Sequence, residues 1–439
     1  MNNLRLLAGL LIAATLSGGV CADAQSSRMV SLEDLFVSAE ANSLQLRPSF
    51  AAELEAEREI AVARADLLPD INASLSLSYI GDGFITNRNY SGFSRAEIPH
   101  LGTGLGINVS QPVYTGGALS ASIDLAQLKS SSSRFATELR RDNIRFSIAG
   151  FYLDLYKYHN LKRVVESNVA SARKVLSEMN ARFEQGTALH NDITRYELLL
   201  SELELRLVKL ENTITILNDN IVTISGLPEG SVVIPDSTLL SRALPESSES
   251  VWQERALTNS PSLSLARSGI DISRKAEDLA RSDYKPKVAL QAAWTMDGPI
   301  LVEVPPINKN LSYWYVGVGV SYNLSSLFKT DKSVAKRRAA TILAQQEYEA
   351  AAENVRLAIR ADYIRYLEAY EELKTQQKSV ELALRNYNTT ATRYAADMAL
   401  ITDMLDAADS RLDAEQRLVN ARINIIYYYY KLLFTSGQI

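Results

Sequence analysis

Residues 71–79 read Ile-Asn-Ala-Ser-Leu-Ser-Leu-Ser-Tyr and residues 101–110 read Leu-Gly-Thr-Gly-Leu-Gly-Ile-Asn-Val-Ser, so apolar side chains alternate with small or polar ones. Residues 288–296 and 314–321 alternate in the same way. A period of two over about 9–11 residues is typical of a membrane β-strand with one face in lipid and the other in water. An amphipathic hairpin packed on a soluble core would also show it. The membrane is favoured by aromatic residues suited to an interfacial girdle, namely Tyr79, Trp294, Tyr313 and Trp314.

Two such hairpins, expected over 70–112 and 287–324, supply four strands. Four strands cannot close a barrel, for which about eight is the practical minimum. An open sheet edge in lipid would leave unpaired backbone groups, each costing several kcal/mol. The sequence therefore predicts that copies of the chain assemble around one barrel. Twelve strands from three chains are favoured over eight strands from two.

The hairpins belong to a tandem duplication. Asn42 recurs as Asn259 at an offset of 217, and Asp192 recurs as Asp403 at an offset of 211. The second offset holds without a gap from residue 109 to residue 226. The six-residue difference falls in the first hairpin, as expected for a surface loop.

Proline is confined to two windows, 48–112 and 228–306. No proline occurs over 113–227 or 307–439. Because proline costs about 3 kcal/mol inside a helix, these two stretches predict long helices. From Ile193 to Ile224 apolar residues recur at alternating spacings of three and four, which is typical of a coiled coil. A helix over 118–184 would be roughly 100 Å long, which suits a duct through the periplasm better than a compact domain.

The expected organisation is a signal peptide, a first repeat, a linker and a second repeat. The boundaries are 1–24 for the signal peptide, 25–230 for repeat 1, 231–250 for the linker and 251–439 for repeat 2. Repeat 1 is expected to contain a helix (31–66), the hairpin 70–112, a long helix (118–184), a tip turn (185–191) and a helix (192–225). Repeat 2 is expected to contain a helix (251–284), the hairpin 287–324, a long helix (329–395), a tip turn (396–402) and a helix (403–435).

The N-terminus predicts export. Arg5 precedes an apolar run over residues 6–14, and Ala22-Asp23-Ala24 offers small residues for cleavage near Ala24. Cys21 leaves a lipoprotein alternative open, in which an acylated cysteine would begin the mature chain. The rest of the sequence has no window of about 19 apolar residues that would predict a transmembrane helix.

Composition argues against several function classes. The chain has 439 residues and a formal net charge of −5, whereas a nucleic-acid partner would require a basic face. One cysteine and three histidines are too few for a disulfide framework or a metal cage. No nucleophile or zinc-hydrolase motif is present. We therefore expect no enzyme activity and no cofactor.

The order of these segments resembles the outer-membrane efflux proteins of TolC type. The resemblance rests on the duplication, on Gln-Pro-Val-Tyr-Thr-Gly-Gly at 111–117, and on Arg-Phe-Glu-Gln-Gly-Thr-Ala-Leu-His-Asn-Asp at 182–192. It implies a homotrimer that combines a 12-stranded membrane β-barrel with an α-helical barrel, a coiled-coil tunnel through the periplasm. The implied protein lies in the outer membrane of a Gram-negative bacterium, in contact with its lipid, and is the passive exit duct of a tripartite pump or a type I secretion system. The implied partners are a periplasmic adaptor (membrane-fusion protein) and an inner-membrane transporter of RND or ABC type.

The resemblance also suggests a gate at the tip. Asp403 and Asp406 match two aspartates that ring the closed entrance in the family, and residues three apart share one face of a helix. Three chains would then place six carboxylates around one axis. Alternatively, Asp403 caps the start of its helix, as Asp192 would in the first copy.

In family members, polar contacts between neighbouring helices hold this tip closed, as a latch. Tyr394 and Asp192 match two of the residues that form this latch. At the position where the family has a basic latch residue, this chain has Ala399. At the glycine position of the second turn it has Asp397. The turns implied to contact the adaptor contain Gly186, Thr187, Ala188, Leu189, Met398, Ala399 and Leu400. The competing interpretation is a periplasmic coiled-coil scaffold or adaptor, which would form no channel and stay soluble without detergent.

Overall fold

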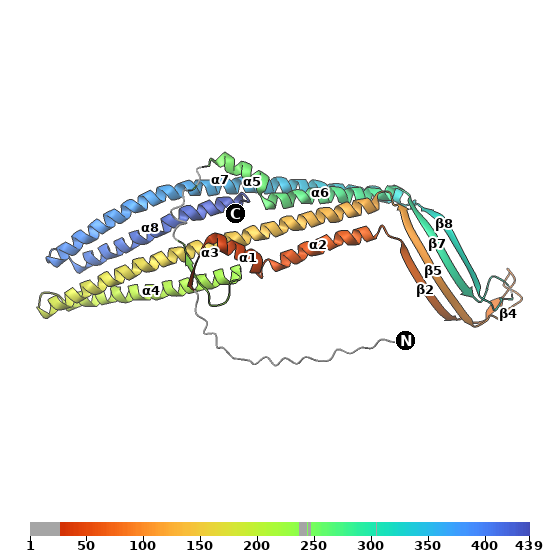
Figure 1. Cartoon of the computed structure of the whole chain (residues 1–439), viewed down its shortest axis with the longest axis horizontal. Coiled ribbons are helices and arrows are strands. Elements are labelled where there is room, and N and C mark those ends of the chain that lie inside the picture. Colours follow the sequence, from red (N-terminus) through yellow and green to blue (C-terminus); the bar gives the residue numbers. More distant parts are fainter. Residues whose placement is uncertain (1–26, 237–243, 245–246, 304) are drawn as a thin grey trace, which may run out of the picture.

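The computed structural model describes residues 27–236, 244, 247–303 and 305–439. The molecule is elongated, with helices along its long axis and a sheet that continues from one end of them (Figure 1). The expected signal peptide 1–24 with Cys21, and residues 237–243 and 245–246 of the expected linker, lie outside the described residues.

Both copies share the order of a short strand, two helices, two long strands, a long helix and a returning helix; the first adds the short strands β3 and β4, and the second adds a 3-10 helix. The first contains β1 (Ser27–Val30), α1 (Leu32–Asn42), α2 (Arg47–Ala65), β2 (Asp70–Tyr79), β3 (Gly83–Ile85), β4 (Ser94–Ala96), β5 (Leu101–Tyr114), α3 (Ala118–Glu184) and α4 (His190–Ser225). The second contains β6 (Val232–Pro235), α5 (Glu249–Asn259), α6 (Pro261–Arg281), the 3-10 helix η2 (Ser282–Tyr284), β7 (Lys287–Gly298), β8 (Leu311–Ser321), α7 (Ser326–Ala395) and α8 (Ile401–Thr435). With 67 and 70 residues, α3 and α7 are each about 100 Å long.

The single helices expected over 31–66 and 251–284 are each divided in two. Ser43 and Ser260, which end α1 and α5, have extended backbone conformations. Pro48 and Pro261 lie in the first turns of α2 and α6, where the missing N–H is not needed. The proline positions therefore favour a new helix start rather than the continuation of one helix.

These breaks accommodate the ends of the returning helices. A Cβ added to Gly226 would lie 2.6 Å from the Cβ of Asn42, and one added to Gly437 would lie 2.6 Å from the carbonyl oxygen of Asn259. Both glycines have positive φ, at 68° and 70°. The duplication is thus visible in the packing, because equivalent glycines approach equivalent asparagines.

Several expected boundaries also shift. The tip turns cover 185–189 and 396–400, because α4 begins at His190 and α8 at Ile401, and α7 begins at Ser326 rather than at 329. In α8 the Asp403 carboxylate accepts the Leu400 N–H at 3.1 Å, which satisfies a donor at the helix start. Within the expected linker, β6 pairs in parallel with β1, a contact that the sequence did not predict.

The four long strands form one antiparallel sheet in the order β2-β5-β7-β8. Directly opposed residues share a face of a sheet, so the registers define rows across all four strands. One row is Ala73, Ile107, Trp294 and Trp314, and the adjacent row is Ser74, Gly106, Thr295 and Tyr313. One face is therefore mainly apolar and the other mainly polar.

The helices pack in the same order as the strands. Helix α2 packs on α3, α3 on α6 and α6 on α7, while α4 and α8 return along α3 and α7. A core near the middle of the molecule surrounds Leu35, Ile148 and Tyr152, and a second core toward the tips surrounds Tyr196 and Met404. Among the described residues, the helices include none with a long enough apolar stretch to cross a membrane.

Candidate functional site

The α3–α4 and α7–α8 turns lie close together at the end of the molecule opposite the sheet (Figure 1). Both turns have the same backbone, since the Thr187 N–H donates to the Arg182 carbonyl at 2.9 Å and the Met398 N–H to the Arg393 carbonyl at 2.8 Å. This turn needs a residue with positive φ, which is Gly186 at 73° in the first copy and Asp397 at 58° in the second. The left-handed conformation costs a residue other than glycine roughly 1–2 kcal/mol, so Asp397 is a costly choice for the turn alone.

Asp397 forms an ion pair with the Arg182 guanidinium of the other hairpin. The same guanidinium lies 6.0 Å from the centre of the Tyr394 ring, a cation–π distance. The Tyr394 hydroxyl in turn donates to the Asp192 carboxylate at 3.5 Å. These four side chains link the two hairpins at the tip.

Burial raises the pKa of the Tyr394 hydroxyl, and the nearby charge of Asp192 raises it further. The hydroxyl therefore remains protonated at neutral pH and can donate to Asp192. The contact is long for a hydrogen bond, and a small relative movement of the hairpins would break it.

The structure thus brings Tyr394 and Asp192 together and adds two residues that sequence reasoning missed. Arg182 supplies a basic group from the opposite hairpin, although the position expected to be basic is Ala399. The signal was present, because Asp397 occupies a position that is glycine in the other copy. Aspartate is one of the few residue types other than glycine that adopt this conformation, and its carboxylate can accept a cationic partner.

Asp403 and Asp406 are exposed on α8, on either side of the buried Met404. Asp403 caps its own helix through the Leu400 N–H, which is the alternative role considered for it. Asp192 does not cap α4, which has no side-chain cap. Equivalent aspartates therefore make different contacts in the two copies.

The acidic row continues along α8. Burial raises the pKa of the Asp409 carboxyl, and the charges of Asp413, Glu202 and Asp406 raise it further. Burial is the larger cause of this shift, and the three neighbouring carboxylates add to it.

The turns themselves present apolar side chains to solvent. Leu189, Met398 and Leu400 are each about 70% exposed, at 69%, 71% and 70%. Gly186 and Thr187 are also exposed, whereas Ala188 and Ala399 are half-buried. The tip therefore offers an apolar surface around a polar cluster.

The expected aromatic girdle is only partly assembled. Trp294 and Trp314 oppose each other on the apolar face, and the Trp294 Nε1–H donates to the Ser312 hydroxyl at 3.1 Å. Tyr79 shares this face but pairs with Leu101 near the loops, six residues farther along its strand than Ala73, which lies in the Trp294 row. Tyr313 lies on the polar face, since adjacent residues of a strand point to opposite sides. The register therefore separates Tyr313 from the other three aromatic residues.

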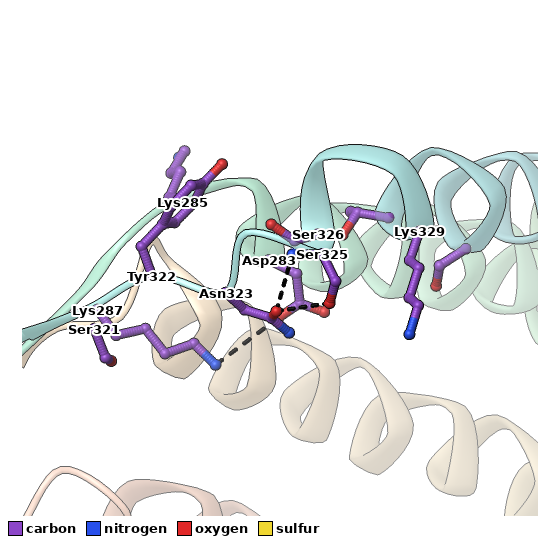
Figure 2. A pocket seen from close by; sticks show the side chains of 11 residues that line it. Asp283, Lys285, Lys287, Ser321, Tyr322, Asn323, Ser325, Ser326 and Lys329 are labelled. Carbon is purple, nitrogen blue, oxygen red and sulfur yellow. Dashed lines mark hydrogen bonds and ion pairs between the residues drawn. The ribbon is translucent and has the colours of Figure 1, made fainter.

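A cavity of about 540 Å³ lies where the sheet meets α7 (Figure 2). Lys287 forms an ion pair with Asp283 at 3.8 Å, and Asn323 accepts hydrogen bonds from the Ser325 N–H and hydroxyl at 3.1 and 2.7 Å. The lining residues are Asp283, Lys285, Lys287, Ser321, Tyr322, Asn323, Ser325, Ser326, Lys329, Thr330 and Ser333. Three lysines and one aspartate make the cavity basic.

Metal chemistry has no evident site in the part of the chain that the structure describes. No group of three or more histidine, cysteine, aspartate or glutamate residues is arranged there to hold a metal ion. The arrangement at the tip is instead suited to holding two helical hairpins together through reversible polar contacts.

Comparison with known proteins gives consistent results. A family model described as outer membrane efflux protein matches residues 35–227 and 252–428. The outer membrane protein TolC of Vibrio cholerae is 23% identical over 414 residues, covering 94% of this chain and 90% of that protein. The pyoverdine export outer membrane protein OpmQ of Pseudomonas aeruginosa is 22% identical over 401 residues, covering 89% and 82%.

Solved structures share the fold. The outer membrane protein VceC of Vibrio cholerae has a TM-score of 0.75 at 15% identity, over 92% of this chain and 96% of that chain. The outer-membrane channel OprN has a TM-score of 0.76 at 16% identity, over 93% and 90%. At these identities the likeness establishes the architecture.

Proposed function

Because the chain belongs to the outer membrane efflux protein family, we propose that it is the exit duct of a tripartite efflux or secretion system. Three copies form one channel, in which three four-stranded sheets make a twelve-stranded barrel in the outer membrane. The helices continue this barrel as a tunnel through the periplasm. Substrates pass passively, and an inner-membrane transporter of RND or ABC type supplies the energy through a periplasmic adaptor.

The observation that carries this proposal is the sheet. Its apolar face is largely exposed, with Leu75, Trp314 and Val318 at 72%, 73% and 66%, and its edge strands β2 and β8 have no further strand partner within the described chain. A lipid-facing sheet must pair both edges, because water is absent to satisfy its backbone groups. Neighbouring copies of the same sheet satisfy this requirement.

We assign Asp403 and Asp406 to the gate. Both carboxylates are exposed at the tip, and three copies would concentrate six of them around the channel axis. Crowded carboxylates attract cations and resist simultaneous ionisation. This ring would make the entrance cation-selective and sensitive to divalent ions.

We assign the cluster of Arg182, Asp397, Tyr394 and Asp192 to the latch that keeps the gate closed. Its contacts join the two hairpins of one chain, so breaking them frees α7 and α8 to move outward. The exposed Leu189, Met398 and Leu400 provide an apolar surface that a helical adaptor can cover. Adaptor binding there would stabilise the open tip.

The test separates a membrane channel from a soluble periplasmic scaffold. We expect the wild-type chain to fractionate with the outer membrane, to purify in detergent as a trimer and to form ion-conducting pores in planar bilayers. A chain that stays monomeric and folded in aqueous buffer without any amphiphile would contradict the proposal and favour the scaffold.

Matched substitutions sharpen this test. Val318→Arg places a charge on the apolar face, at a cost of about 2–4 kcal/mol if it lies near the middle of the bilayer. Gly317→Arg is the control on the polar face, where a side chain has open space, because no atom lies within 4 Å of the point that its Cβ would occupy. We expect Val318→Arg to reduce the yield of membrane trimer several-fold and Gly317→Arg to leave it unchanged.

A further inference from the structure

The polar face of the four-stranded sheet carries mostly small side chains. On β2 over 72–78 and on β5 over 102–110, the residues of this face are serine, glycine or asparagine. The aromatic residues of this face, within the described strands, both lie on β8, where Tyr313 opposes Thr295 and Tyr315 opposes Ala293. The two tyrosines are 51% and 48% exposed, so about half of each side chain is accessible to a molecule on this side of the sheet.

The first copy has no counterpart of these two rings. At the offset of 211, Tyr313 and Tyr315 correspond to Gly102 and Gly104 on β5. A Cβ on these glycines would lie 2.3 and 2.6 Å from a serine hydroxyl oxygen of β2, so no side chain fits there without displacing its neighbours. Strand β5 lies between β2 and β7, whereas β8 is the last strand of the sheet (Figure 1). The tyrosines are therefore a feature of the second copy alone.

The burial of the residues opposite the tyrosines indicates how the rings lie. Ala293 is 7% exposed, and the Thr295 hydroxyl is buried with no hydrogen-bond partner in the described part of the chain. Because directly opposed side chains are nearest neighbours on a sheet face, each of these small residues is covered by the large side chain opposite. The rings therefore lean across the wall and leave one side open.

We infer that Tyr313 and Tyr315 form an aromatic collar inside the barrel that binds aromatic organic cations in transit. The inference rests on the channel proposed above, in which three copies turn the polar face toward the lumen, and it adds a class of substrate to that channel. Three copies contribute six rings, in three pairs separated by glycine-lined sectors. A twelve-stranded barrel is roughly 24 Å across between opposite strands, so a ligand on one pair of rings leaves the lumen open.

The spacing of the two rings suits a flat ligand. Aromatic rings stack on one another in offset arrangements, and their faces attract cations. Two positions apart on one strand, the Cα atoms of Tyr313 and Tyr315 are about 7 Å from each other. One planar molecule can therefore contact both rings, while the phenol hydroxyls keep polar groups at the water-filled interior.

Asp297 supplies a negative charge on the same face. It opposes Leu311, which places it diagonal to Tyr313 at about 7–8 Å between Cα atoms. Its carboxylate lies toward Gly104, 3.1 Å from the point that a Cβ would occupy there, and it forms no ion pair within the described residues. The separation is comparable with the Debye length of about 8 Å at physiological ionic strength, so this charge acts on a cation held at the collar.

The other charges of the barrel do not neutralise Asp297. Lys287 and Asp70 also lie on the polar face, but at its helix end. Lys287 opposes Ser321, which is six residues or about 20 Å along β8 from Tyr315. The formal charges of the loops beyond the strands cancel; they belong to Asp82 and Arg95, which form an ion pair, and to Arg88, Glu97, Glu303 and Lys309.

The competing role for the two tyrosines is structural. Because β8 is an edge strand within the chain, large side chains on it would also brace the contact with a neighbouring copy. The two roles differ in whether a free aromatic cation competes for the rings.

Chemical protection tests the collar in the wild-type chain. The probe is ethidium, a planar aromatic cation, and tetraethylammonium is the matched cation without an aromatic ring. Exposed tyrosines of the detergent-purified trimer are nitrated with tetranitromethane and quantified by mass spectrometry. We expect ethidium, and not tetraethylammonium, to lower the nitration of Tyr313 and Tyr315 several-fold. Tyr90, which is 82% exposed in a loop, is the internal control, and equal nitration of all three with and without ethidium would overturn the inference.

Substitutions separate the ring from the charge. Ethidium binding is followed by fluorescence anisotropy in an Asp403→Ala, Asp406→Ala background, so that the acidic tip does not bind the dye. We expect Tyr313→Ser with Tyr315→Ser to weaken binding about tenfold, and Tyr313→Phe with Tyr315→Phe to preserve it because the rings remain. Asp297→Asn should weaken binding less, by a factor that shrinks as salt is added.

The outcomes distinguish the collar from the channel that contains it. Unchanged ethidium binding in a serine variant that still forms conducting trimers would overturn the collar and leave the channel proposal intact. A serine variant that no longer forms trimers, combined with no protection of the wild-type tyrosines by ethidium, would assign the rings to the contact between copies. If the wild-type chain forms no trimer, the channel proposal fails and the collar fails with it.

Discussion

The two tips of the helical hairpins share a backbone and differ in chemistry. In the first copy the left-handed position is Gly186, and Phe183 packs against His190 of its own hairpin, with ring centres 5.6 Å apart. In the second copy the equivalent residues are Asp397 and Tyr394, and both contact the other hairpin. A duplicated turn can therefore keep its backbone while its side chains change partners, since Asp397 accepts from Arg182 and Tyr394 donates to Asp192.

The equivalent aspartates of the two copies also differ in their contacts. Asp192 accepts the Tyr394 hydroxyl across the hairpins, whereas Asp403 caps its own helix and is exposed. If the two copies were functionally equal, substitutions at equivalent positions would have equal effects. Substitutions in the two copies test that equality.

Breaking the latch should have the largest effect. Arg182→Ser combined with Tyr394→Phe removes the ion pair, the cation–π contact and the hydroxyl bond to Asp192. We expect single-channel conductance in planar bilayers to rise several-fold, because the hairpins are freed to separate. The matched control is Arg393→Ser, which changes the equivalent arginine of the second copy and should leave conductance unchanged. Equal conductance in both variants would remove the latch from the proposal.

Removing the acidic ring should weaken block by divalent cations. Asp403→Ala with Asp406→Ala removes six carboxylates from a trimer, and we expect the concentration of divalent ion needed for half-block of conductance to rise. Asp406→Ala alone leaves the α8 cap intact and should give part of this effect. Asp331→Ala, at the other end of α7, is the control. Unchanged block in the double variant would reject the gate assignment.

A buried carboxylate distinguishes the two copies in stability. Burial raises the pKa of Asp142 from 3.8 to about 6, whereas its counterpart Glu353 is exposed. A raised pKa favours the folded state below about pH 4, and this contribution is lost as the pH rises toward 6. Asp142→Asn should therefore stabilise the detergent-purified trimer at pH 8 by about 1–3 kcal/mol per chain and give no advantage at pH 4.

Glu353→Gln is the matched control for this titration. Thermal unfolding followed across pH 4–8 should show a profile for Glu353→Gln that parallels the wild type. A flat difference between Asp142→Asn and the wild type over this range would contradict the raised pKa.

Making the two turns identical should have the smallest effect on stability. Asp397→Gly relieves roughly 1 kcal/mol of backbone strain and removes an exposed ion pair worth about 0.2–1 kcal/mol. We expect the thermal stability of the trimer to change little and its conductance to rise less than in the double latch variant. A large loss of stability would show that the ion pair does more than hold the gate.

Local periodicity predicted much of the fold. The family predicted from segment order is confirmed by the match to its model. The period of two predicted which residues of β2 and β5 share a face, because alternation is a property of the strand itself. The same rule places the neighbours Tyr313 and Trp314 on opposite faces of the sheet.

The sequence did not predict contacts between segments that are far apart in the chain. The pairing of β1 with β6, the lysine cavity and the ion pair of Arg182 with Asp397 join residues that no local pattern connects. Asp397 stands out in the sequence because it occupies a glycine position. Its partner Arg182, however, lies more than two hundred residues earlier in the chain. Only the packing of one hairpin against the other selects Arg182.

The repeat, the long helices and the two-faced strands can be read from the sequence, because they depend on backbone propensities and periodicities that each segment carries alone. The tertiary structure decided which strands are neighbours, which copy's aspartate accepts a bond across the hairpins and which edges remain open. Those outcomes depend on how rigid helices about 100 Å long align, and small differences in packing along such a length decide which side chains meet at their ends.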